Sequence, residues 1–157
     1  MAISRRWALV ALLGAASPAS GNTQAGIAID THMFVERVTT DVNGRARRIL
    51  MEADRAERGD SLVFVVNWRH AGAQPVSGIA LTNIVPGRVL IEPADEAMLV
   101  SVDGGVRWGR LDQLWMPTQL GGTRRAMAED VTHVRWTMPG RIAPGQSGRM
   151  SYRGTAR

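Results

Sequence analysis

Apolar and polar positions alternate with a period of two in several short segments, and no segment repeats apolar residues at helical spacing. The clearest is 62–69, where four apolar side chains share one face: Leu62, Phe64, Val66 and Trp68. Residues 131–138 alternate in the same way, and Gly, Pro, Asn and Asp interrupt the runs at regular intervals. The pattern predicts an all-β chain of about seven to nine short antiparallel strands, packed as a β-sandwich.

The pattern also predicts where the other strands and turns lie. Asn43-Gly44 is a two-residue hairpin signal that would join two strands into an N-terminal hairpin over 33–51. Residues 52–59 are rich in charge and have no apolar face, so they predict a loop. Residues 112–128 form the longest segment without a periodic pattern of apolar residues. The remaining expected strands are 76–85, 88–91, 99–102, 106–111 and 149–153.

The first residues have the layout of a secretory signal peptide: a basic head over 1–6, an apolar run over 7–16 and small residues beyond it. We expect cleavage after Ala19, with cleavage after Ala25 as an alternative. The apolar run is about half the length that a bilayer requires, so no transmembrane span is expected in the mature chain. Residues 20–157 are then one exported domain in the periplasm, outside the cell or on its surface.

Composition excludes several kinds of chemistry. The chain has no cysteine, which rules out disulfides, thiolate metal sites and a cysteine nucleophile. All nineteen basic residues are arginine, so a lysine Schiff base is also ruled out. The formal charge is +5, but the arginines are dispersed among fourteen acidic residues. This pattern argues against a nucleic-acid partner, which would require a dense basic stripe.

No set of residues combines a nucleophile, a base and an orienting group, so we predict no catalytic, cofactor-binding or metal-binding residues and no enzymatic activity. His32 and Met33 suggest copper chemistry, but neighbouring side chains on a strand point to opposite faces. Trp115, Arg124 and Arg125 form the candidate partner contact, although for Trp115 itself we favour folding back to cap one end of the core over an exposed contact.

A resemblance to a known family rests on an ordered set of short motifs. Gly59-Asp60 precedes the alternating strand 62–69, an "S-x-D-G-G" hairpin follows at 101–105, and residues 134–136 with 142–148 resemble a final pair of strands. Residues 59–157 thereby resemble the bacterial surface and secreted repeat module called domain of unknown function eleven. The resemblance implies an immunoglobulin-like β-sandwich. The family occurs as tandem arrays, whereas this chain has a single copy, which puts the role of array scaffold in doubt.

These observations together predict a non-enzymatic, exported structural or interaction module of the bacterial cell envelope. Its partner would be an unknown envelope protein or glycan, contacted through loops or an unpaired strand edge, and self-association through such an edge is one expected mode. The alternative prediction is a periplasmic carbohydrate- or copper-binding protein that uses Trp115 or His32.

Overall fold

The computed structural model describes residues 22–24, 26–92 and 96–157. This part of the chain holds thirteen β-strands and two short 3₁₀ helices, and every strand pairing is antiparallel. The predicted all-β fold is confirmed. The predicted signal peptide, residues 1–19, lies outside the described residues. No helix in the described ranges has the length and apolar character to cross a membrane.

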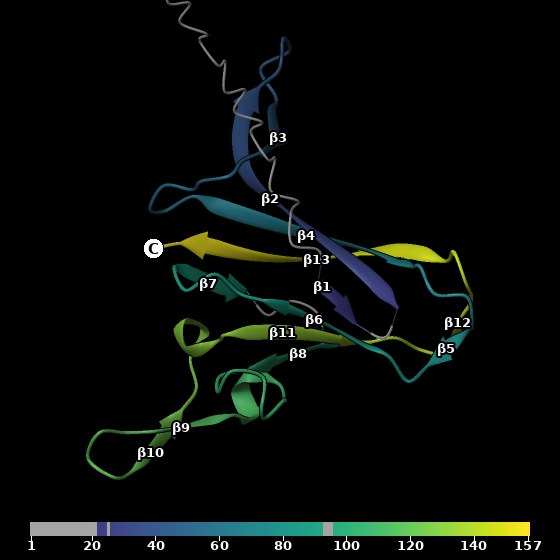
Figure 1. Cartoon of the computed structure of the whole chain (residues 1–157). Helices are drawn as coiled ribbons and strands as arrows, with labels where there is room; N and C mark the ends of the chain where they lie inside the picture. Colours follow the sequence, from purple (N-terminus) through teal and green to yellow (C-terminus); the bar gives the residue numbers. More distant parts are fainter. Residues whose placement is uncertain (1–21, 25, 93–95) are drawn as a thin grey trace, which may run out of the picture.

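The larger sheet has six strands and contains both ends of the described chain (Figure 1). Its strands, in spatial order, are β1 (Asn22–Gln24), β2 (Ile27–Thr40), β4 (Ser61–His70), β13 (Ser147–Ala156) and β7 (Val89–Glu92). Strand β3 (Ala46–Glu52) also pairs with β2. The longest ladders join β4 to β2 and to β13, so β4 occupies the middle of the sheet.

The smaller sheet packs against the larger one and has three strands, in the order β6 (Ala80–Ile84), β11 (His133–Thr137) and β8 (Met98–Ser101). A two-stranded pair, β5 (Val76–Ser77) with β12 (Arg141–Ile142), prolongs the β6–β11 ladder. A separate hairpin of β9 (Trp115–Pro117) and β10 (Thr123–Arg125) projects from the smaller sheet (Figure 1). The helices are η1 (Leu111–Gln113) and η2 (Ala128–Asp130).

The core lies between the two sheets and contains the apolar face predicted for β4. Leu62, Phe64, Val66 and Trp68 are all buried. The opposing sheet contributes the inward-facing residues of its own alternating strands: Leu81, Val100, Val134 and Trp136. Burial of this set of large side chains is the main force that holds the two sheets face to face.

Trp68 depends on a glycine in the neighbouring strand. In the β4–β13 ladder Trp68 lies directly opposite Gly148, and the indole ring covers the glycine. A Cβ atom on residue 148 would lie 2.8 Å from the ring carbon Cζ2 and 2.9 Å from the indole nitrogen. Gly148 therefore provides the space that lets the Trp68 ring lie flat against the sheet.

A chain of two hydrogen bonds leads from exposed Thr31 on β2, through Asn83 on β6, to buried Tyr152 on β13. The Thr31 hydroxyl donates to the Asn83 side-chain oxygen at 3.1 Å, and the Asn83 amide donates to the Tyr152 hydroxyl at 3.1 Å. The Tyr152 ring stacks on Phe64 with ring centroids 4.7 Å apart, and its burial raises the pKa of the phenol. This chain connects strands of both sheets, β2 and β13 of the larger sheet and β6 of the smaller one.

The structure does not form the strand expected over 106–111. Asp103 instead folds this segment back on itself, because its carboxylate accepts the Arg107 main-chain N–H at 2.9 Å and the Arg107 Nε–H at 2.7 Å. Only Gly109 makes a β-bridge, to Val100. The Asp-Gly-Gly turn that the sequence indicated is thus present, but it leads into a loop.

We expect Gly148→Ala to lower the free energy of unfolding by about 1–3 kcal/mol, since the added methyl would collide with the Trp68 ring. Chemical denaturation followed by tryptophan fluorescence measures the change. Gly87→Ala is the matched control, because a Cβ there meets nothing within 4 Å. Equal stability of the two variants would contradict the packing described for Trp68.

Candidate functional site

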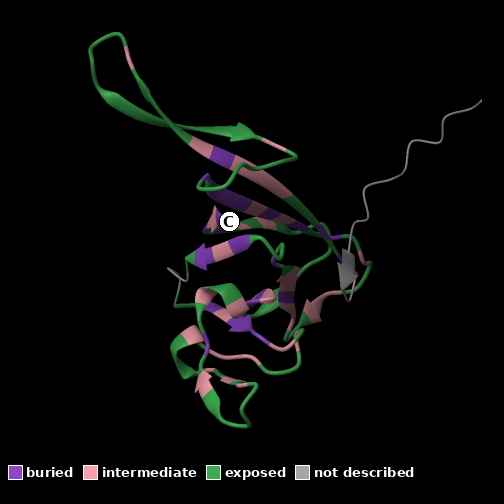
Figure 2. Ribbon diagram, turned by 90° about the vertical axis from the view of Figure 1, so that its left-hand side faces the viewer, coloured by how far each residue is buried: buried purple, intermediate pink, exposed green. Residues whose placement is uncertain are grey.

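The β2–β3 hairpin extends well beyond the sandwich as a two-stranded arm, at the top of Figure 1. Strand β4 pairs with β2 only as far as Glu36. Residues 37–40 have β3 as their only strand partner in the described part of the chain. We call β2 from Arg37 onward, the turn and β3 the arm. Figure 2 shows that most of the arm is exposed.

The turn of the arm differs from the predicted two-residue loop. The Asp41 N–H donates to the Arg45 carbonyl at 2.9 Å, which leaves Val42, Asn43 and Gly44 as a three-residue loop. Gly44 has a φ of 76°, in the left-handed region that such loops require at this position. The Asp41 carboxylate accepts the N–H groups of Asn43 and Arg45, which stabilises the loop further.

Ion pairs hold the base of the arm to the sandwich. Arg37 contacts the poorly exposed carboxylate of Asp60 at 2.5 Å, and this contact lowers the pKa of Asp60. Glu36 accepts two hydrogen bonds from Arg153 on β13, at 3.0 and 3.3 Å, and also lies 3.7 Å from Arg48. Both contacts fix the direction in which the arm leaves the sheet.

Strand β3 exposes apolar side chains that no described element covers. Ile49, Leu50 and Met51 are 42%, 48% and 55% exposed, and Val38 on β2 is 70% exposed. The sequence pattern of the returning strand over 47–51 predicts that Met51 faces the core, and this prediction is wrong: Met51 is exposed, because β2 is the only strand beside it in the described residues. The sequence does contain a signal: three consecutive apolar residues on a strand cannot all point to one face.

A cluster of one histidine and two carboxylates lies where β3 returns to the sandwich. The His32 ring contacts Asp30 through Nε2 at 2.7 Å and Glu52 through Nδ1 at 2.5 Å. The hydrogen bond to Glu52 is the larger cause that raises the pKa of His32, followed by the one to Asp30. Protonated His32 therefore connects the end of β3 to β2 through its charge-assisted contact with Glu52, and its second contact, with Asp30, lies within β2.

The predicted partner contact at Trp115, Arg124 and Arg125 is only partly brought together. Trp115 is half-exposed, and the Arg125 guanidinium lies 4.8 Å from its ring centre. Arg124 points away and makes a bidentate ion pair with Asp130, at 2.6 and 2.7 Å. The β9–β10 register explains the difference, because it places Trp115 opposite Arg125 and Met116 opposite Arg124. Trp115 therefore does not fold back to cap the core.

Trp108 is the other tryptophan in a loop, and it belongs to the surface of the smaller sheet. Its indole N–H donates to the Gly105 carbonyl at 2.8 Å, and the Arg135 guanidinium covers the ring at 3.7 Å. The His133 ring lies edge-on to it, with centroids 6.2 Å apart. These contacts fix the ring, and little of its face is left for a ligand.

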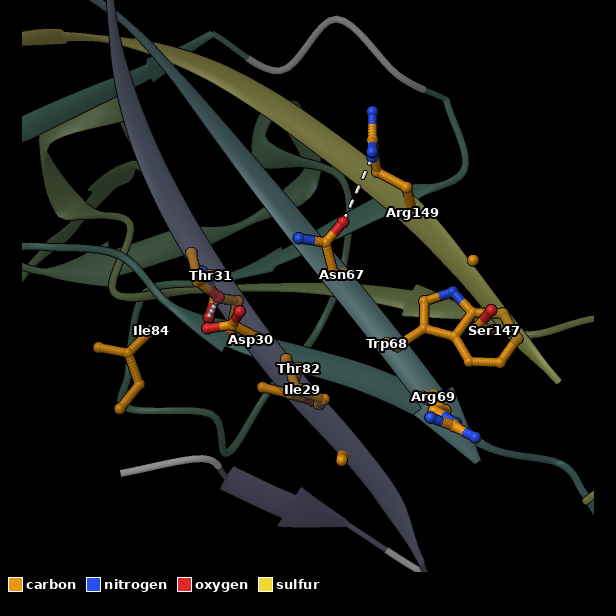
Figure 3. Close-up of a pocket in the computed structure, with 13 residues that line it drawn as sticks. Ile29, Asp30, Thr31, Asn67, Trp68, Arg69, Thr82, Ile84, Ser147 and Arg149 are labelled. Atoms are coloured by element: carbon orange, nitrogen blue, oxygen red, sulfur yellow. Dashed lines mark hydrogen bonds between the residues drawn. The ribbon is translucent and has the colours of Figure 1, made fainter. Parts of the chain in front are cut away.

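An open groove of about 1370 Å³ lies where β2, β4 and β13 approach β6 (Figure 3). Polar and apolar residues alternate along the strands that line the groove. Asp30 and Asn67 therefore lie beside apolar residues such as Ile29 and Trp68. Two hydrogen bonds cross it, from Arg149 to Asn67 and from Thr31 to Asn83. The groove is open to solvent rather than an enclosed pocket.

The three histidines have three different environments within the described residues. His32 contacts carboxylates only, and His133 contacts the Thr132 hydroxyl at 3.0 Å. His70 is fully buried, with its Nδ1 atom unpaired. Met33 packs against the core on the opposite face from His32. No group of three or more histidine, aspartate or glutamate residues in these ranges is arranged to hold a metal ion.

We expect His32 to titrate above its ordinary value of 6.5, because both carboxylates favour the protonated ring. Its contribution to stability is complete below that value and is lost as the pH rises through the raised pKa. NMR titration of the ring, together with amide exchange along β3, measures both effects. Glu52→Gln should lower the pKa of His32, whereas the remote Glu57→Gln should leave it unchanged. A His32 that titrates at 6.5 would contradict this expectation.

Comparison of this chain with family models, with curated proteins and with solved structures finds no match.

Proposed function

We propose that the protein is a non-enzymatic interaction module, exported to the bacterial cell envelope, and that the arm is its contact surface. The observation that carries the proposal is the uncovered apolar set on the arm, which includes Val38, Ile49, Leu50 and Met51. Exposed apolar residues that gather on one projecting element are typical of binding surfaces, because association removes them from water.

The attachment of the arm supports the same proposal. The Arg37–Asp60 and Glu36–Arg153 contacts hold its base, so a partner meets strands that are already oriented. An element that is ordered before binding loses less conformational entropy on association than a flexible loop does. The sandwich then serves as a rigid support that carries the arm away from the domain body.

The resemblance to the immunoglobulin-like module of residues 59–157 stays a prediction, and it agrees with a supporting role for the sandwich. The arm precedes that region, and its presence would separate this chain from a simple repeat unit. The carbohydrate- or copper-binding alternative ranks second, since the exposed face of Trp115 carries Arg125 and Met33 does not lie beside His32.

Photo-crosslinking tests the contact surface. A photoreactive amino acid replaces Val38 or Met51 on the arm, in cells that produce the full chain. The matched controls are Val106 and Met127, which have similar exposure away from the arm: 78% and 48%, against 70% and 55%. We expect defined covalent adducts from the two arm positions and few or none from the controls. Adducts of equal yield at all four positions, or none at the arm, would reject the arm as the contact surface.

Export has its own test. We expect the protein recovered from the periplasm or medium to begin at Ser20, as measured by intact mass, because cleavage is predicted after Ala19. Replacement of Ala19 by Arg should block this cleavage, since the site accepts small residues. Recovery of the uncleaved chain from the cytoplasm alone would remove the envelope from the proposal.

A further inference from the structure

Strand β3 has a free edge, because β2 is its only strand partner in the described ranges. All seven of its residues are exposed, and it contains neither proline nor glycine. A free edge presents main-chain N–H and C=O groups that a further strand can pair with. Natural proteins usually protect such edges, yet here the middle of the strand is apolar and uncovered.

The register shows which residues direct their main-chain groups to this edge. Hydrogen bonds from Asp41 N–H to the Arg45 carbonyl, and from Ala53 N–H to the Met33 carbonyl, belong to the same ladder as the β2–β3 pairs. Hydrogen-bonded and non-hydrogen-bonded pairs alternate along an antiparallel ladder. The odd-numbered residues of β3 therefore bond to β2, and its four even-numbered residues direct their main-chain groups outward: Ala46, Arg48, Leu50 and Glu52.

The sequence of β3 is complementary to itself in one antiparallel alignment. With Leu50 opposite Leu50 of a second copy, Arg48 lies opposite Glu52 of that copy, and the reverse pair forms by symmetry. Ile49 of each copy then lies opposite Met51 of the other copy, on the face of the strand opposite to Leu50. A shift that places Ile49 opposite itself puts Arg47 against Met51 and loses both charge pairs. Opposite charges and apolar pairs across a ladder are favourable, so the first alignment is preferred.

Charge on the arm favours a second protein chain over a membrane surface. Arg37 contacts Asp60, Arg47 contacts Asp41 at 3.1 Å, and Arg48 lies near Glu36. Much of the positive charge is thus neutralised within the molecule, whereas binding to anionic lipid depends on a basic face. Arg48 and Glu52 nonetheless have side chains that are mostly exposed, so each remains accessible to a second copy.

We propose that two copies of this chain associate through antiparallel pairing of their β3 edges, with the two-fold axis at Leu50. The two larger sheets then join into one continuous sheet, and Ile49, Leu50 and Met51 of both copies cover one another. The interface is isologous, which closes the assembly at two copies. This inference rests on the proposed function, because it names the partner of the arm.

Charge reversal tests the alignment. Arg48→Glu places Glu opposite Glu52 at both ends of the pairing, and Glu52→Arg places Arg opposite Arg48 at both ends. Each variant alone should associate at least tenfold more weakly than the unmodified protein in sedimentation velocity. An equimolar mixture should recover nearly full association, since a mixed dimer contains two opposite-charge pairs. Arg45→Glu, in the turn of the arm, is the control and should behave as the unmodified protein.

Engineered cysteines test the register, and the chain has no cysteine to interfere. In the proposed alignment residues 49 and 51 of different copies form a non-hydrogen-bonded pair, with Cα atoms about 4.5 Å apart. That distance permits a disulfide. A mixture of Ile49→Cys and Met51→Cys should cross-link on mild oxidation, whereas each variant alone should not. Cross-linking of Ile49→Cys alone would overturn the proposed register.

Other outcomes reject the proposal outright. These are an unmodified protein that is monomeric up to millimolar concentration, a dimer that neither charge reversal weakens, and arm-dependent binding of the monomer to anionic vesicles. Circular dichroism of each variant confirms that it is folded, so that a loss of association is not caused by a loss of structure.

A monomer whose arm still gives adducts to a different protein would reject the second copy as partner and leave the proposed function standing. A monomer without arm adducts would reject both.

Discussion

The structure depends on a mismatch in length between two neighbouring strands. Strand β2 continues to Thr40, but β4 pairs with it only as far as Glu36. Beyond that point β3 is the only neighbour in the described residues, so no second sheet covers either face. Apolar residues that would enter a core in a longer sheet are exposed there instead. The arm follows from this constraint, and the free edge follows from the pairing of β3 with β2 alone in the described residues.

Different interactions stabilise the sandwich and the arm. Inside the sandwich, packing of large side chains dominates, with Trp68 against Gly148 and a chain of two hydrogen bonds through Asn83 that connects strands of both sheets. The arm has almost no packing of that kind, and charged contacts at its base hold it in place. Such contacts weaken when a partner charge is lost, and this makes the arm the part most sensitive to pH and salt.

Much of the fold was predictable, whereas the candidate site was predictable only in part. Alternation in 62–69 correctly placed Trp68 in the core because a strand buried on one face has period two. Trp115 could not be placed in this way, since its exposure depends on the pairing of β9 with β10 rather than on its own neighbours. Arg124 and Arg125 are adjacent in sequence, but the same pairing sends one to Asp130 and the other to Trp115.

The amino-acid sequence by itself determined the all-β class, the inward face of β4 and the presence of the N-terminal hairpin, because these depend on local periodicity and turn residues. Only the tertiary structure decided the register of that hairpin. A two-residue turn at Asn43-Gly44 would set Glu52 opposite Val35, whereas the observed three-residue loop sets it opposite Phe34. A shift of one residue reverses every side chain of a strand. The contact of Glu52 with His32 therefore depends on a loop geometry that the local sequence did not determine.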